Sequence, residues 1–112
     1  MTGPLRLPAS RSVSWTHRAL ADLEGIHDYI ARDNPAAASK WVSRILATAG
    51  KVAMAPFAGR RVPEIGRDDV REVFLRTYRI VYRVNGKRCE ILTVFEGHRR
   101  FPGDVAAPCD AD

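Results

Sequence analysis

Apolar and aromatic residues occupy every second position of the segment YRIVYRV, residues 78–84. The positions between them are Arg79, Val81 and Arg83. A period of two with β-branched and aromatic residues predicts a strand, because successive side chains of a strand point to opposite faces of a sheet. We therefore expect the first set to face a core beneath helices, and the two arginines to lie on an uncovered face that meets solvent or a partner.

Two further strands flank this one, at residues 71–75 and 88–95. The pair Asn85-Gly86 stands between the second and third alternating runs, and both residues tolerate the positive φ that two-residue hairpin turns require. We therefore expect three consecutive antiparallel strands. A shorter strand is predicted near the beginning of the chain, at residues 12–15.

Two helices are predicted between the first strand and the other three. Residues 17–32 carry an apolar stripe with spacings of three and four, which is typical of one face of a helix. The residues of this stripe are Ala19, Leu23, Ile26 and Ile30. Thr16 and Asn34 suit the N-caps of the two helices, and Pro35 suits the first position of the second helix, which we expect to run to about Met54.

The order of these elements is β-α-α-β-β-β, which predicts the α+β class. We expect an N-terminal strand and an antiparallel two-helix hairpin packed on one face of a twisted antiparallel sheet, whose other face stays open. Residues 55–69 have no sustained period and predict an irregular loop. The domain organisation expected is a flexible leader at 1–12, a single domain at 13–102 and an acidic, disordered tail at 103–112.

Composition adds a basic character to this picture. The chain has 112 residues, 46% of them hydrophobic, which fits one domain. Its net charge is +5, and the first 103 residues hold eighteen basic and ten acidic residues. Such a body favours polyanions or an acidic protein partner. Two cysteines without metal-ligand spacing favour a reducing cytoplasm, and neither a secretory signal nor a run of eighteen apolar residues points to a membrane.

Three groups of side chains are candidates for chemistry. Arg79 and Arg83 share a face of their strand and could hold a phosphate, or could simply keep an exposed face soluble by pairing with an acid such as Glu90. Glu64 stands in the loop sequence GRRVPEIG and could accept a proton, or could neutralise a neighbouring arginine. His98 follows the last strand in FEGHRRFP and could act as an acid or base, or could belong to a solvated exit from the sheet.

No motif for a nucleotide cofactor or a metal is present, because the chain lacks a P-loop, GxSxG, HExxH and any zinc-ligand pattern. We therefore expect neither a metal nor a small-molecule cofactor.

Four runs of the chain together resemble the RelE/ParE family of bacterial toxins from type II toxin-antitoxin pairs. They are VSWTHRALADLEGIHDYIARDNPAAA, GRRVPEI, VREVFLRTYRIVYRV and EILTVFEGHRRFP. The resemblance covers Val13 to Pro102. It implies a small α+β toxin of the cytoplasm that inhibits growth and is neutralised by a cognate antitoxin.

The family has two modes of action, and the resemblance admits both. ParE-like members poison DNA gyrase and need no nuclease site, whereas RelE-like and YoeB-like members are endoribonucleases that cut messenger RNA on the ribosome without a metal. The helical segment DLEGIHDYIARDNPAAA is more ParE-like, so gyrase is the expected target. Ribosome-dependent cleavage is the alternative, and the question of whether the chain is an enzyme stays open. A basic nucleic-acid-binding domain without toxicity is the third hypothesis, supported by charge alone.

The nuclease alternative assigns roles by resemblance. Glu64 matches the general base of YoeB-like toxins, Arg79 the arginine that stabilises the phosphate, and His98 the general acid. A second alignment compares Glu96-Gly97-His98 with a His-Gly-Arg common in ParE-like members, and gives His98 no inherited role. The basic face expected to bind the target, whether gyrase or the ribosome with its messenger RNA, consists of Arg61, Arg71, Arg83, Arg99 and Arg100.

Overall fold

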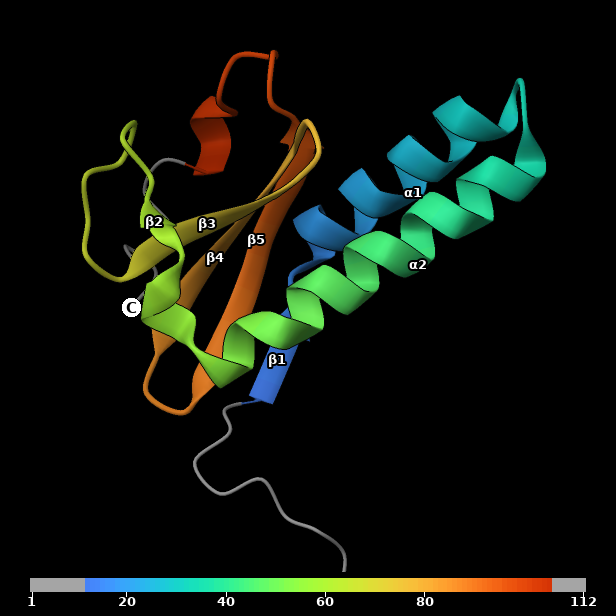
Figure 1. Cartoon of the computed structure of the whole chain (residues 1–112). Helices are drawn as coiled ribbons and strands as arrows, with labels where there is room; N and C mark the ends of the chain where they lie inside the picture. The colour runs from blue at the N-terminus through green and yellow to red at the C-terminus, as the bar shows by residue number, and fades with distance from the viewer. Residues whose placement is uncertain (1–11, 106–112) are drawn as a thin grey trace, which may run out of the picture.

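A computed structural model of the chain describes residues 12–105, and its strands form one twisted sheet beside two helices (Figure 1). The elements in chain order, with η for a 3-10 helix, are β1 Ser12–Trp15, α1 His17–Ala31, α2 Pro35–Lys51, η1 Val52–Met54, η2 Pro56–Ala58, β2 Arg60–Arg61, β3 Val70–Leu75, β4 Tyr78–Asn85, β5 Arg88–Glu96 and η3 Gly103–Val105. The α+β class is confirmed. The leader expected at 1–12, apart from Ser12, and residues 106–112 of the expected tail lie outside the described residues.

Both helices begin at the caps that the sequence predicts. The Thr16 side chain accepts a hydrogen bond from the Ala19 backbone N–H, and the Asn34 side chain accepts one from the Ala37 N–H. These side chains satisfy donors that the first turn of a helix leaves unpaired. None of the helices in this part of the chain has the length and apolar character needed to cross a membrane.

The sheet has the strand order β1-β5-β4-β3-β2. The pairs β3–β4 and β4–β5 are antiparallel, as expected, but β1 runs parallel to β5 and makes the sheet mixed. The expectation of a wholly antiparallel sheet is therefore wrong for β1. The β4–β5 turn consists of Gly86-Lys87 rather than Asn85-Gly86, because Asn85 still pairs with Arg88 and only Gly86, at φ 61°, takes the left-handed conformation.

Helix α1 completes the edge of β5 where β1 ends. Strand β1 pairs with β5 only as far as Ile91. Beyond that point the Thr16 hydroxyl donates to the Ile91 carbonyl at 3.0 Å, and the Asp22 carboxylate accepts hydrogen bonds from the Thr93 hydroxyl and the Val94 N–H. Without such partners, the backbone N–H and C=O groups at this edge of β5 would lack hydrogen bonds. Side chains at the start of α1 thus take the place of a neighbouring strand.

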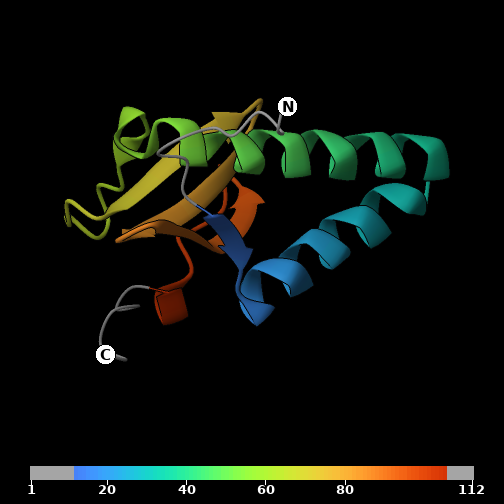
Figure 2. The same ribbon diagram turned by 90° about the horizontal axis from the view of Figure 1, so that it is seen from below.

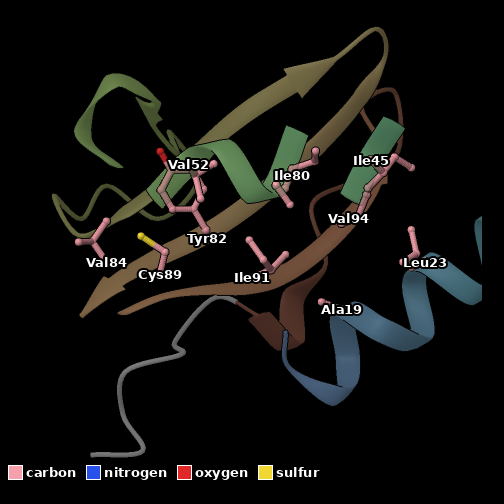
Figure 3. Packing of buried hydrophobic residues seen from close by; sticks show 11 residues of the cluster. Ala19, Leu23, Ile45, Val52, Ile80, Tyr82, Val84, Cys89, Ile91 and Val94 are labelled. Atoms are coloured by element: carbon pink, nitrogen blue, oxygen red, sulfur yellow. The ribbon is translucent and has the colours of Figure 1, made fainter. Parts of the chain in front are cut away.

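The main core lies between the sheet and the helices (Figure 3). Ile80, Tyr82 and Val84 of β4 pack there with Ile45 of α2 and Val52 of η1. These β4 residues are the ones that the alternating pattern assigns to a helix-covered face, so that prediction is confirmed.

The opposite face of the sheet is covered as well, and the expectation of an open face is wrong. A second cluster of buried residues lies there, consisting of Val62, Val70, Val81, Leu92, Phe95 and Val105, with Ile65 and Phe101 packed against it. The cover comes from the loop after β2 and from η3, which lies on the side of the sheet away from α2 (Figure 2). Val105 is only 6% exposed, so the first residues of the expected disordered tail belong to the fold.

The segment expected to be an irregular loop contains η2 and β2, and it is anchored to the sheet by two side chains. The Tyr82 hydroxyl donates to the Pro56 carbonyl, and the Arg71 guanidinium donates to the Gly59 carbonyl at 3.0 Å and the Phe57 carbonyl at 3.3 Å. Gly59 stands at the tightest point of this contact, where a Cβ atom would meet the Tyr82 hydroxyl and lie 2.9 Å from the Glu72 carbonyl oxygen.

We expect Gly59→Ala to lower the free energy of unfolding by about 1–3 kcal/mol, because the added methyl group forces the loop away from Tyr82 and Glu72. Gly25→Ala is the matched control, since its Cβ meets no atom within 4 Å and replaces a glycine inside α1. That change should raise stability by about 0.5–1 kcal/mol. Urea unfolding measures both, and equal effects of the two variants would contradict the close packing at Gly59.

Candidate functional site

Arg79 is buried at the centre of a cluster of charges on the sheet face opposite the helices. Its side chain is only 8% exposed. Its Nε donates to Glu72 Oε1 at 2.7 Å, while Nη1 and Nη2 donate to the two oxygens of Glu64 at 3.0 and 2.8 Å. The second of these contacts is a bidentate pair, the strongest geometry for an arginine and a carboxylate. Two of the three residues proposed for nuclease chemistry, Glu64 and Arg79, are therefore in direct contact.

Two aromatic rings complete this cluster, which we call the Arg79 cluster: Arg79, Glu64, Glu72, Phe95 and Phe101. The guanidinium carbon of Arg79 lies 5.2 Å from the centre of the Phe95 ring and 5.3 Å from that of Phe101. Phe95 comes from β5 and Phe101 from the segment that leads to η3. Cation–π attraction is larger at a desolvated site such as this one. The expectation that Arg79 faces solvent is therefore wrong, because residues remote in sequence cover it.

Glu72 is the member of the cluster that the candidate residues from the sequence omit. Its side chain is fully buried, and its second oxygen accepts a hydrogen bond from Arg60 Nε at 2.8 Å. A buried carboxylate needs such partners, since its desolvation is costly. Glu72 shares a face of β3 with Val70, which is buried, and with Phe74, which is half exposed, so the alternating pattern alone does not mark it as buried.

The contact between Arg79 and Glu64 changes the titration of both groups. The hydrogen bonds from Arg79 lower the pKa of Glu64 below its ordinary value, although partial burial opposes this effect. The same contact raises the pKa of Arg79. A carboxylate with a lowered pKa is a weaker proton acceptor, and a guanidinium bound by two carboxylates has fewer donors for a phosphate. The arrangement therefore suits a structural ion pair better than a general base.

His98 is separate from the Arg79 cluster in its contacts. Its side chain is 70% exposed, and its Nδ1 lies 3.9 Å from Glu96 Oε2. The His98 backbone N–H donates to Glu96 Oε1 at 2.9 Å. Within residues 12–105, no hydrogen bond or ion pair joins His98 to Glu64 or Arg79. Glu64 and Arg79, two of the three proposed nuclease residues, are therefore in contact with each other, whereas His98 contacts neither in this part of the chain.

The arginines expected to form one basic face lie in different places. Arg71 pairs with Tyr82 in the sheet and so points to the helix side, where it holds the loop. Arg83 lies on the opposite face, 3.5 Å from Asp69, and the exposed Arg61 donates to the Gly66 carbonyl. Arg99 and Arg100 line a groove beside α1. A single continuous basic face is therefore wrong, and the role of these residues in target binding stays a prediction.

Metal ligands do not gather in the described part of the chain, where no three His, Cys, Asp or Glu side chains come together in a way that could hold an ion.

The sequence of this chain is similar to those of known toxins. The family model described as the ParE toxin of the type II toxin-antitoxin system parDE matches residues 13–101. The protein Y4kP of Sinorhizobium fredii is 38% identical over 95 residues, which cover 82% of this chain and 94% of that one. The toxin RelE2 of Caulobacter vibrioides is 46% identical over 48 residues, 43% of this chain and 54% of that one.

Two solved structures are similar in fold. The chromosomal ParDE toxin-antitoxin system from P. aeruginosa contains a chain with a TM-score of 0.66 and 28% identity, over 79% of this chain and 97% of that one. The toxin-antitoxin complex RelBE2 from Mycobacterium tuberculosis contains a chain with a TM-score of 0.57 and 20% identity, over 78% and 98%. The second likeness concerns the fold alone.

We expect Arg79→Met to lower the free energy of unfolding by about 3–5 kcal/mol, because it leaves the buried Glu72 carboxylate without its closest cation. Arg83→Met is the matched control, since it lies on the same face of the same strand but makes a looser, more exposed contact. It should cost no more than about 1 kcal/mol. If urea unfolding shows the two variants equally stable, the Arg79 cluster does not hold this face together.

The lowered pKa of Glu64 predicts a pH dependence of stability. A carboxylate whose folded pKa lies below its ordinary value of 4.5 stabilises the fold above that pH, and the stabilisation is lost as the pH falls through the folded pKa. Glu64→Gln should therefore unfold at a lower urea concentration than the wild type near pH 7, and the difference should shrink below about pH 4. A difference that stays constant down to about pH 3 would show that ionised Glu64 is not what stabilises the fold.

Proposed function

This chain belongs to the ParE toxin family of type II toxin-antitoxin systems, and from this premise we propose that it inhibits growth in the cytoplasm by acting on DNA gyrase until a cognate antitoxin binds it. In this proposal the toxin acts by binding to gyrase, and it needs no nuclease site of its own.

One observation carries the preference for this mode, namely the binding of Arg79 by two carboxylates. Its guanidinium is bound by Glu64 and Glu72 and flanked by two phenylalanine rings. A nuclease would need this cation free for the phosphate and Glu64 free to take a proton. The contacts favour a role for both residues in the fold, and this supports a toxin that acts through its surface.

A protein partner that neutralises the toxin is supported by the comparisons. The similar chain from P. aeruginosa comes from a toxin-antitoxin system, as does the fold relative from Mycobacterium tuberculosis. The basic body of this chain also suits a partner with acidic segments.

We expect toxicity to survive both Glu64→Ala and His98→Ala when each variant is expressed in bacteria without an antitoxin. The gyrase proposal requires neither a base nor an acid, so each purified variant should inhibit DNA supercoiling by gyrase as the wild type does. His98 is exposed, so its substitution leaves the core intact. Because Glu64 belongs to the Arg79 cluster, the soluble amount of the Glu64→Ala variant has to be compared with that of the wild type.

The opposite result favours messenger RNA cleavage. If both variants are soluble but harmless, and the wild type leaves supercoiling by gyrase unchanged, the gyrase proposal fails. Bacteria that grow normally with the wild-type protein would contradict toxicity itself and would leave the third hypothesis, a basic nucleic-acid-binding domain.

A further inference from the structure

A groove of about 800 Å³ runs between α1 and the end of β5 with the segment that follows it. One wall is a face of α1, to which Arg18, Gly25, Tyr29 and Arg32 contribute. The other wall includes Arg99 and Arg100. The groove, which we call the α1 groove, shares Phe95 with the Arg79 cluster but contains neither Arg79 nor the carboxylates of that cluster.

The charges that line the α1 groove are mixed, with an excess of positive charge. Its carboxylates are Asp22, Asp28 and Glu96, and its cations are Arg18, Arg32, Arg99 and Arg100. Of the carboxylates, only Asp22 pairs with one of these arginines in the described residues, namely Arg18, while Asp28 and Glu96 contact His27 and the His98 N–H. Arg32 and Arg100, in contrast, form no ion pair within residues 12–105. Arg32 follows α1 and Arg100 follows β5, so these two lining residues reach the groove from different elements, and Arg99 lies close to Glu96. A ligand with more than one negative charge would match this arrangement.

An aromatic surface lies next to these cations. Tyr29 is 71% exposed, an unusual exposure for a ring of this size, and the Arg32 guanidinium carbon lies 5.9 Å from the centre of the ring. Proteins that bind single-stranded nucleic acids often place exposed aromatic rings next to arginines. The bases stack on the rings, and the arginines contact the phosphates. The carboxylates of an acidic peptide would not use the ring in this way.

The dimensions of the α1 groove fit a strand rather than a single ion. The α1 wall extends from Arg18 to Arg32, roughly 21 Å at 1.5 Å per residue. A wall of this length exceeds the spacing of successive phosphates in a single strand, so more than one phosphate can lie against it. The α1 wall is open at Gly25, because a Cβ there would meet no atom within 4 Å apart from the helix's own neighbouring backbone.

We propose that the α1 groove binds a single strand of nucleic acid, with its phosphates on Arg32 and Arg100 and a base on the Tyr29 ring. Duplex DNA fits less well, because its bases are stacked on one another and leave no face for Tyr29. This inference does not depend on the target proposed above, and it concerns a surface that neither Glu64 nor His98 forms.

The test is fluorescence anisotropy of labelled twelve-nucleotide DNA and RNA strands with the full-length protein over a series of salt concentrations. Arg32→Ser with Arg100→Ser should weaken binding and flatten the slope of log K against log salt by about 1.4, or 0.7 for each phosphate contact. Tyr29→Ala should weaken binding about 5-fold to 100-fold with little change in the slope. The DNA and RNA arms show which strand is preferred.

Two controls separate the α1 groove from general charge and from misfolding. Arg44→Ser with Arg88→Ser removes the same charge from α2 and from the far end of β5, and should change the affinity less than about 2-fold. Gly25→Leu should place a side chain from the α1 wall into the groove and abolish binding without lowering the unfolding temperature, since its Cβ has open space.

The proposal fails if the Arg44/Arg88 control weakens binding as much as the Arg32/Arg100 variant, or if Gly25→Leu binds like the wild type. It also fails if the strands do not bind while a polyglutamate peptide does so through Arg32 and Arg100, because the groove is then a site for an acidic protein segment. None of these outcomes bears on inhibition of gyrase, which is measured separately.

Discussion

The burial of one guanidinium group is the constraint around which the second face of this sheet is built. A buried cation is stable only with carboxylates within hydrogen-bonding distance, and Arg79 has two, one from the neighbouring strand and one from the loop. The aromatic cover of the same group comes from Phe95 and Phe101. Because these partners come from four separate segments, the ion pairs fix the loop and the chain after β5 on the sheet, and a second small core of apolar residues closes beside them.

The opposite side of the molecule is organised by the unequal lengths of β1 and β5. Strand β1 covers only the first part of β5, and the Asp22 carboxylate satisfies the backbone that it leaves free. Helix α1 is therefore tied to the edge of the sheet by its first turns, and from there it extends away from the sheet to meet α2 (Figure 2). The α1 groove is the space between α1 and the end of β5, and it is lined by the arginines and the exposed Tyr29 described above. The same edge interaction that completes the sheet thus creates a surface for a ligand.

As a result, the residues that stabilise the second face of the sheet are different from the surface residues proposed to bind a ligand. Glu64 and Arg79, which the nuclease resemblance would place at a reacting phosphate, are bound to each other, and His98 lies in the turn after β5 with Glu96 as its partner. Among the cations without an ion pair in the described residues, Arg32 at the end of α1 and Arg100 in the segment after β5 line the α1 groove. The proposed binding mode therefore directs attention to positions on the surface rather than to the Arg79 cluster.

The sequence by itself determined the features that depend on neighbouring residues. The caps at Thr16 and Asn34, the apolar stripe of α1 from Ala19 to Ile26 and the assignment of Ile80 and Tyr82 to the core follow from spacing and local hydrogen bonding, and these features hold in the structure. Only the tertiary structure decided the parallel direction of β1, the cover over the second face and the burial of Arg79. The physical reason is that an alternating pattern states which residues share a face but not what lies on it. What covers Arg79 is Glu64 and Phe101. The loop and the C-terminal segment that carry these two residues have no regular period, so their position over Arg79 could not be predicted.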